Sequence, residues 1–234
     1  MAIGPLFAEC AVRSLEAYGP AAKIGRGAAQ ASLTITDGIP GFREGIIAFR
    51  GTERDPRDIA ADLRASPVVV GGVTVHRGIY EAFESIMPEL AKLPHGRYTA
   101  TGHSLGGALA LLAGVWLQDV RRVVTFGAPR VLDVAGADAM AAEVGLVGAQ
   151  KCSVYRVVRR GDPVPWLPPL AAGAWLGARY RHVGELLYID RLGRIRHSPT
   201  QLECAYDLAI GPRVDPLAAH SMRGYLEALR GPTA

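Results

Sequence analysis

The chain has 234 residues, with 26 basic and 22 acidic side chains and a formal net charge of +4. Apolar residues make up 49% and charged residues 21%, a globular composition that excludes disordered, collagen-like and disulfide-scaffold proteins. The weak positive charge, without a basic run interleaved with aromatic residues, argues against nucleic acid as a partner. Because no stretch is typical of a linker, we expect one domain over residues 1–234.

The hydrophobic pattern along the chain predicts alternating helices and strands. Helices are predicted over 6–18, 58–63, 79–93, 105–117, 135–143 and 217–229. Strands are predicted over 32–36, 45–49, 73–76, 98–101, 123–126, 153–158 and 186–189, the last at the edge of a sheet. Pro88 falls inside the third helix, where we expect a kink. This alternation favours an α/β protein with a largely parallel sheet.

Cysteine spacing and targeting signals carry mainly negative information. Cys10, Cys152 and Cys204 are far apart and lack the spacing of metal ligands, so we expect buried structural thiols and no metal site. The N-terminus has no basic region and no signal peptide pattern, which makes the cytoplasm the default expectation. Residues 98–118 lack charge but contain several glycines, and they predict a strand, a turn and a buried helix rather than a transmembrane segment.

The segment from Gly102 to Gly107 reads Gly-His-Ser-Leu-Gly-Gly and lies between a predicted strand and an apolar helix. This Gly-x-Ser-x-Gly pattern is typical of a nucleophile elbow, in which a serine on a strained turn needs small neighbours. The alternative is a glycine-rich turn whose Ser104 caps the helix. The strand before it and the helix after it favour Ser104 as a nucleophile.

A serine nucleophile needs a histidine base and a carboxylate that orients the histidine, in the chain order serine, acid, histidine. Asp162 follows a predicted strand and precedes a proline-rich loop, whereas Asp190 follows a late strand. His220 is predicted at the start of the last helix, where a loop returns to the sheet edge. We expect structural roles for His182 and for His103, which adjoins the nucleophile.

Several blocks in order make the sequence resemble the class 3 lipases, the fungal-type α/β-hydrolases. The blocks are Phe49-Arg50-Gly51-Thr52, Val75-His76-Arg77-Gly78, the serine block 102–107, Thr125-Phe126-Gly127-Ala128-Pro129-Arg130, Gly161-Asp162-Pro163-Val164-Pro165, Tyr180-Arg181-His182-Val183-Gly184 and His220-Ser221-Met222 with Tyr225. They extend from about residue 45 to residue 225. Jointly they are specific, although only the serine block is specific by itself.

The resemblance implies an α/β-hydrolase fold with Ser104 as nucleophile, Asp162 as orienting acid and His220 as base. It also implies that Thr52 and the backbone N–H of Leu105 donate to the oxyanion, without a metal or organic cofactor. For Thr52 the alternative is a cap on the helix that follows it. Members of the family are often secreted and disulfide-bonded, features for which this sequence gives no sign.

The resemblance also places a lid after the oxyanion turn, and the candidate here is residues 53–66. This segment is rich in charge, and its larger apolar residues are Ile59 and Leu63. We therefore expect little interfacial activation. Ile59, Leu63, Val164 and Trp166 are candidates to line an acyl groove, with core packing as the alternative for Trp166.

These residues together predict a serine carboxylic-ester hydrolase, a lipase or esterase acting on acyl glycerides or other acyl esters. Its expected partners are an acyl-ester or lipid substrate and, transiently, a lipid surface. The alternatives are a phospholipase or a feruloyl-type esterase with the same triad. A non-catalytic binding scaffold is disfavoured because all three triad residues are present.

Overall fold

The computed structural model describes residues 4–19, 24–25, 29–36, 44–51, 67–141, 152–168 and 178–230. A seven-stranded sheet organises them in the order β1-β2-β5-β6-β8-β10-β11. Neighbouring strands from β2 to β10 pair in parallel, whereas β1 and β11 are antiparallel at the two edges. The bounds are β1 Ala31–Thr36, β2 Glu44–Phe49, β5 Arg97–His103, β6 Val120–Phe126, β8 Ser153–Arg159, β10 Glu185–Ile189 and β11 Ile195–His197.

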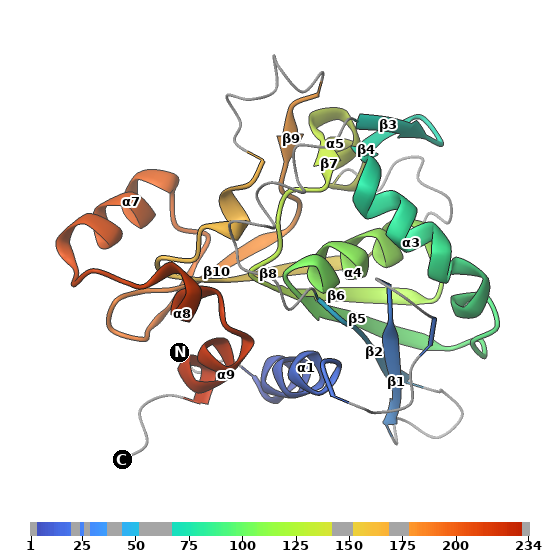
Figure 1. The fold of residues 1–234 in the computed structure, drawn as a ribbon, viewed down its shortest axis with the longest axis horizontal. Helices are drawn as coiled ribbons and strands as arrows, with labels where there is room; N and C mark the ends of the chain where they lie inside the picture. The colour runs from blue at the N-terminus through green and yellow to red at the C-terminus, as the bar shows by residue number, and fades with distance from the viewer. Residues whose placement is uncertain are drawn as a thin grey trace.

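Helices cover both faces of this sheet (Figure 1). On one face α1 (Pro5–Glu16) packs against α9 (Met222–Arg230), and on the other α3 (Arg77–Leu90) packs against α4 (Leu105–Trp116). Helix α7 (Gln201–Ile210) lies over the end of the sheet that β8 and β10 form, where Cys204 packs against Val158 and Tyr188. The shorter helices are α5 (Val134–Ala141), α8 (Pro216–His220) and the 3₁₀ turn η1 (Val164–Trp166).

A small antiparallel sheet, in the order β3-β4-β7-β9, lies beside α5. Its strands are β3 Pro67–Val70, β4 Val73–His76, β7 Leu132–Asp133 and β9 Tyr180–Arg181. The β3–β4 hairpin turns through Gly71 and Gly72, both with positive φ, as a two-residue hairpin turn requires.

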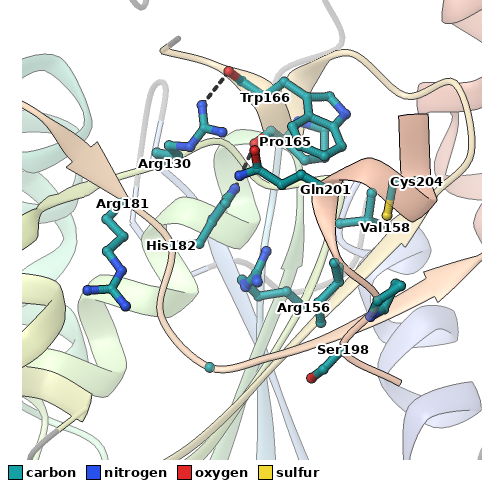
Figure 2. Close-up of a pocket in the computed structure, with 13 residues that line it drawn as sticks. Arg130, Arg156, Val158, Pro165, Trp166, Arg181, His182, Ser198, Gln201 and Cys204 are labelled. Atoms are coloured by element: carbon teal, nitrogen blue, oxygen red, sulfur yellow. Dashed lines mark hydrogen bonds between the residues drawn. The ribbon is translucent and has the colours of Figure 1, made fainter. Parts of the chain in front are cut away.

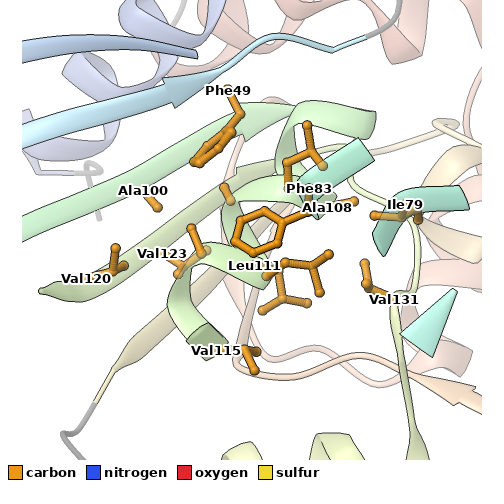
Figure 3. Close-up of a cluster of buried hydrophobic side chains, with 14 of the residues drawn as sticks. Phe49, Ile79, Phe83, Ala100, Ala108, Leu111, Val115, Val120, Val123 and Val131 are labelled. Atoms are coloured by element: carbon orange, nitrogen blue, oxygen red, sulfur yellow. The ribbon is translucent and has the colours of Figure 1, made fainter. Parts of the chain in front are cut away.

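The main hydrophobic core lies between the sheet and the helices α3 and α4 (Figure 3). Helix α4 is apolar around its whole circumference, and Leu109 and Leu112 are fully buried. Phe83 of α3 and Phe49 of β2 pack into the same cluster. Each such side chain contributes roughly 1.5–3 kcal/mol on burial, so this core fixes α4 and the turn that precedes it.

The prediction of a mostly parallel α/β sheet is confirmed, and every predicted strand forms within a few residues of its expected bounds. Pro88 lies inside the third predicted helix, α3, as expected. The predicted helix 58–63 lies outside the described residues. No helix among those described is long and apolar enough to cross a membrane.

Three expectations about the C-terminal third were wrong. Strand β10 is not at the edge, because β11 pairs with it on its outer side. Helix α7 was not predicted, since Leu202 and Tyr206 leave apolar side chains exposed and blur its period. The final helix breaks at Ser221, whose backbone is extended, so His220 ends α8 instead of beginning a long helix.

Candidate active site

Ser104 stands between β5 and α4 with φ 57° and ψ −126°, a conformation that L-residues rarely adopt. Gly102 and Gly106 make this turn sterically feasible. A Cβ on Gly102 would overlap the carbonyl group of Gly106, and a Cβ on Gly106 would overlap the carbonyl oxygen of Phe49. The strained turn predicted from the sequence is therefore present, and the serine side chain makes no capping hydrogen bond to the helix.

Three side chains from distant parts of the chain meet at this turn. His220 Nε2 lies 3.0 Å from Ser104 Oγ, and His220 Nδ1 lies 3.0 Å from each carboxylate oxygen of Asp162. All three residues are buried, with exposed fractions of 0% for Ser104, 1% for Asp162 and 5% for His220. The structure thus brings the predicted serine, acid and histidine together in a hydrogen-bonded chain.

The carboxylate of Asp162 receives two further hydrogen bonds. The backbone N–H of Val164 donates to Oδ1 at 2.9 Å, and the Tyr225 hydroxyl donates to Oδ2 at 2.6 Å. The same hydroxyl accepts from the backbone N–H of Arg159 at 3.0 Å. Burial, and then the charge of Asp162, raises the pKa of Tyr225 well above its ordinary value, so the phenol stays protonated and keeps donating.

Tyr225 is therefore part of the hydrogen-bonded site, although sequence reasoning gave it no role. In the sequence Tyr225 stood out only as a member of the block that begins at His220, and the structure places it in α9. The aromatic ring of Tyr225 also packs edge-on against Phe126, the last residue of β6. Asp162 is thereby held between its own loop and α9.

The ring of His103 packs against that of His220, and the two ring centroids lie 4.5 Å apart. His103 Nε2 is 2.5 Å from the carbonyl oxygen of His220, and His103 Nδ1 is 2.7 Å from the Tyr18 hydroxyl. Because a carbonyl can only accept, Nε2 carries the proton and Nδ1 accepts from Tyr18. Burial, and then His220, holds the pKa of His103 well below its usual value, and both ring nitrogens are engaged within the fold.

The backbone N–H of Leu105 belongs to the first residue of α4 and has no acceptor within the helix. A negative charge that developed beside Ser104 would lie next to this N–H and to the positive end of the helix dipole. Thr52, the other predicted oxyanion donor, lies outside the described residues, although the chain is described up to Gly51.

The predicted substrate-lining residues divide into three groups. Ile59, Leu63 and the candidate lid 53–66 lie outside the described residues. Trp166 is 39% exposed at the end of η1, whereas Val164 is fully buried in the main core. The side chain of Val164 therefore packs in the core at the loop of Asp162, and its place in an acyl groove stays a prediction.

The other candidate acid and bases are engaged elsewhere. Asp190 accepts hydrogen bonds from Leu192 and Arg194 in the turn between β10 and β11. His182 Nε2 bonds to the carbonyl oxygen of Pro165, and His197 pairs with Glu185 at 2.6 Å.

The three cysteines are free thiols; Cys10 and Cys204 are buried, whereas Cys152 is half-buried. Burial raises the pKa of Cys10 to about 12 and that of Cys152 to about 11.

Comparison with known proteins finds lipases and phospholipases among the relatives of this chain. The chain is 31% identical over 186 residues to the secreted mono- and diacylglycerol lipase 1 of Fusarium solani, a match that covers 68% of this chain and 52% of the lipase. It is 37% identical over 110 residues to phospholipase A1 PLIP1 of Arabidopsis thaliana, covering 40% of this chain and 16% of that enzyme. The chain thus spans about half the length of the first relative and less of the second.

A solved fungal lipase–inhibitor complex superposes with a TM-score of 0.63 at 20% identity, over 96% of this chain and 97% of that one. This likeness confirms the α/β-hydrolase fold. Residues 46–172, more than half of the sequence, match the family described as Lipase (class 3). On this match the chain belongs to the class 3 lipase family.

Proposed function

We propose that this chain is a serine carboxylic-ester hydrolase that cleaves acyl glycerides or other acyl esters. The observation that carries the proposal is the position of His220, 3.0 Å from Ser104 Oγ on one side and 3.0 Å from the Asp162 carboxylate on the other. A serine needs an adjacent base to become a nucleophile, and the base needs a partner that fixes its tautomer.

In the proposed reaction Ser104 Oγ attacks the ester carbonyl while His220 Nε2 takes its proton. Asp162 accepts from His220 Nδ1–H throughout and stabilises the imidazolium that forms. When the tetrahedral intermediate collapses, the C–O bond breaks and His220 protonates the departing alcohol. Water then attacks the acyl-enzyme, with His220 as base, and the carboxylic acid leaves as Ser104 recovers its proton.

The negative oxygen of each tetrahedral intermediate requires hydrogen-bond donors that are already in place. The Leu105 N–H is one proposed donor, and Thr52 is the other on the strength of the family resemblance. Ile59, Leu63, Val164 and Trp166 remain the proposed contacts for the acyl chain. Since Ser104 has no exposed surface, substrate has to displace residues that cover it, and segment 53–66 remains the candidate lid.

Two relatives support a choice of substrate class, since one is a mono- and diacylglycerol lipase and the other a phospholipase A1. We propose neutral acyl glycerides as the first choice, because the glyceride lipase match covers more of this chain. A phospholipase A1 activity is the second candidate, supported by the higher identity of the shorter match. Parallel assays on dioleoylglycerol and on phosphatidylcholine vesicles would separate them.

The experiment that tests the proposal measures hydrolysis of p-nitrophenyl esters of increasing acyl length, across the concentration at which each substrate forms micelles. We expect turnover of soluble short-chain esters and less than a tenfold increase above the threshold, because the charged segment 53–66 has only two larger apolar residues. Absence of hydrolysis on every ester would contradict the proposed activity. A larger increase would show instead that the lid controls access.

A further inference from the structure

A cavity of about 460 Å³ lies away from the triad, at the end of the sheet beneath α7. Its floor comes from β8 and β10, its roof from the Pro165–Trp166 turn, and its side from residues 198–201 and Cys204 of α7 (Figure 2). The side chains of β8 that line it, Arg156 and Val158, point to the opposite face from Val157, which packs among residues of α1 and α9. The cavity is thus separate from the triad, and the two share only the loop that begins at Asp162.

The charge of this cavity is one-sided. Arginines 130, 156 and 181 line it, and no aspartate or glutamate is among the described residues that do so. Arg181 is paired with Asp138 on the exposed side. Arg130 is buried and donates to the carbonyl oxygens of Trp166 and Pro168, which fix its position, but no carboxylate in the described part of the chain pairs with its charge.

Arg156 is the least satisfied group in the cavity. Its side chain makes no hydrogen bond or ion pair with any residue in the described ranges, and its Nε is buried without a partner. Figure 2 shows its guanidinium pointing toward the side of the cavity where His182 and Gln201 lie. Burial, and then the positive charge of Arg130, lowers the pKa of Arg156 to about 10, which still leaves it protonated at neutral pH. A half-buried cation without an anion is costly unless a ligand supplies the charge.

His182 contributes to the same environment. Its Nε2 bonds to the carbonyl oxygen of Pro165 at 2.6 Å, so this nitrogen carries a proton and the ring is fixed. Burial, and then the charge of Arg156, holds the pKa of His182 well below its usual value. The imidazole is therefore neutral and adds no further positive charge beside the two arginines.

Most of the remaining lining is apolar, with Ser198 and Gln201 as uncharged polar residues. The apolar part comprises Val158, Pro165, Trp166, Leu186, Pro199 and Cys204. A guanidinium matches the oxygens of a carboxylate or phosphate with paired hydrogen bonds. An apolar chain attached to that group would lie along the walls and reach the surface beside the partly exposed Trp166. We propose that this cavity binds a single-chain amphiphile through its anionic headgroup, a carboxylate or phosphate, with Arg156 as the principal contact.

This proposal does not depend on the proposed hydrolase activity, although a fatty-acid product would have the required chemistry. The two sites are connected through one loop, because Asp162 accepts from Val164 N–H and the next two residues, Pro165 and Trp166, line the cavity. A ligand in the cavity would thus contact the same loop that positions Asp162.

The test measures binding by calorimetry to protein whose Ser104 has first been capped with a fluorophosphonate. Octyl phosphate, octanoate, 1-octanol and inorganic phosphate are compared below any micelle threshold. We expect both anionic amphiphiles to bind at least tenfold more tightly than octanol or inorganic phosphate. Arg156→Met should weaken their binding at least tenfold, and Arg156→Lys should weaken it less because it keeps the charge but loses the paired geometry. Arg223→Met, an exposed position on α9, is the matched control and should bind as wild type does.

Three results would overturn the proposal. The first is that octanol binds as tightly as octyl phosphate. The second is that Arg156→Met binds the anionic amphiphiles as tightly as Arg223→Met does. The third is that capping of Ser104 abolishes binding seen with the uncapped protein, which would place the ligand at Ser104. Equal binding of inorganic and octyl phosphate would contradict the role of the apolar walls. If Arg156→Met does not fold, the wild-type ligand series and Arg156→Lys still decide. Failure of the probe to label Ser104 would count against the hydrolase and leave the comparison of arginine variants intact.

Discussion

At the scale of single residues, the orientation of the Asp162 carboxylate depends on hydrogen bonds from residues outside the triad. This carboxylate accepts from His220, from its own loop and from Tyr225 at 2.6 Å. A hydrogen bond to a charged group contributes about 1.5–3 kcal/mol. Tyr225 is therefore a positioning residue, which keeps the carboxylate oriented toward His220.

Replacing Tyr225 by Phe should lower kcat about tenfold and leave KM nearly unchanged, because the lost contact orients the acid and does not bind substrate. Steady-state kinetics on a soluble ester would measure both constants. Tyr206→Phe is the matched control, since this hydroxyl belongs to a residue that is 65% exposed on α7. A change confined to KM, or equal effects of the two variants, would contradict the positioning role.

The residues of the site differ in how far the sequence reveals them. Ser104 is recognisable because its turn chemistry is local, with glycines two positions away on either side. Asp162 and His220 are recognisable from chain order and from their places at element ends. The contribution of Tyr225 is not, because its partner lies 63 residues earlier and only tertiary packing brings the two together. For Val164 the sequence does not decide, because an apolar residue in a loop fits a groove and a core equally well.

At the scale of elements, the junction of β2, β5 and α4 sets the position of Ser104. The N-terminus of α4 approaches β2 so closely that a side chain on Gly106 would overlap the Phe49 carbonyl oxygen and lie 2.8 Å from the carbonyl carbon of Arg50. Backbone atoms cannot turn aside as a flexible side chain can. The close approach therefore requires glycine at this position.

Gly106→Ala should destabilise the fold by about 3 kcal/mol or more, a size associated with overpacking against a fixed backbone. Gly78→Ala is the control, because its Cβ would meet nothing closer than 3.7 Å at the start of α3. This second change should be neutral or stabilise the fold by up to about 1 kcal/mol. Urea unfolding of both variants measures the difference. Equal unfolding midpoints would show that the junction relaxes and is not rigid.

Elements with strong periodicity were predicted from the sequence, whereas those made by tertiary contacts were not. Strands β7 and β9 have only two residues each and exist because they pair with β4 and with each other. Strand β11 follows a tight turn after β10, and its three residues carry too little pattern to be recognised. The break between α8 and α9 was missed because Ser221 interrupts a run that otherwise keeps a helical period.

At the scale of the whole molecule, stability should depend on pH through His103. This residue is neutral in the folded state because burial and His220 lower its pKa well below its usual value. In the unfolded chain it takes up a proton as the pH falls through about 6.5. The unfolded state then binds more protons than the folded state, so stability is lost as the pH falls below that value.

Between pH 7 and pH 5 this one residue should cost up to about 2 kcal/mol of unfolding free energy. Urea titrations of the wild type and of His103→Gln at both pH values measure the effect. The variant is expected to be less stable than the wild type at pH 7 but to lose less stability on acidification. An identical pH dependence in the two proteins would mean that His103 is protonated in the fold.

The proposed chemistry rests on Ser104 as the attacking group, and labelling with a fluorophosphonate followed by peptide mass analysis tests this most directly. We predict a single adduct on Ser104 in the wild type, none in a folded Ser104→Ala variant, and a loss of ester hydrolysis in that variant of about 10³-fold or more. An adduct on another residue, or a folded variant that retains a tenth of the wild-type rate, would contradict the assignment.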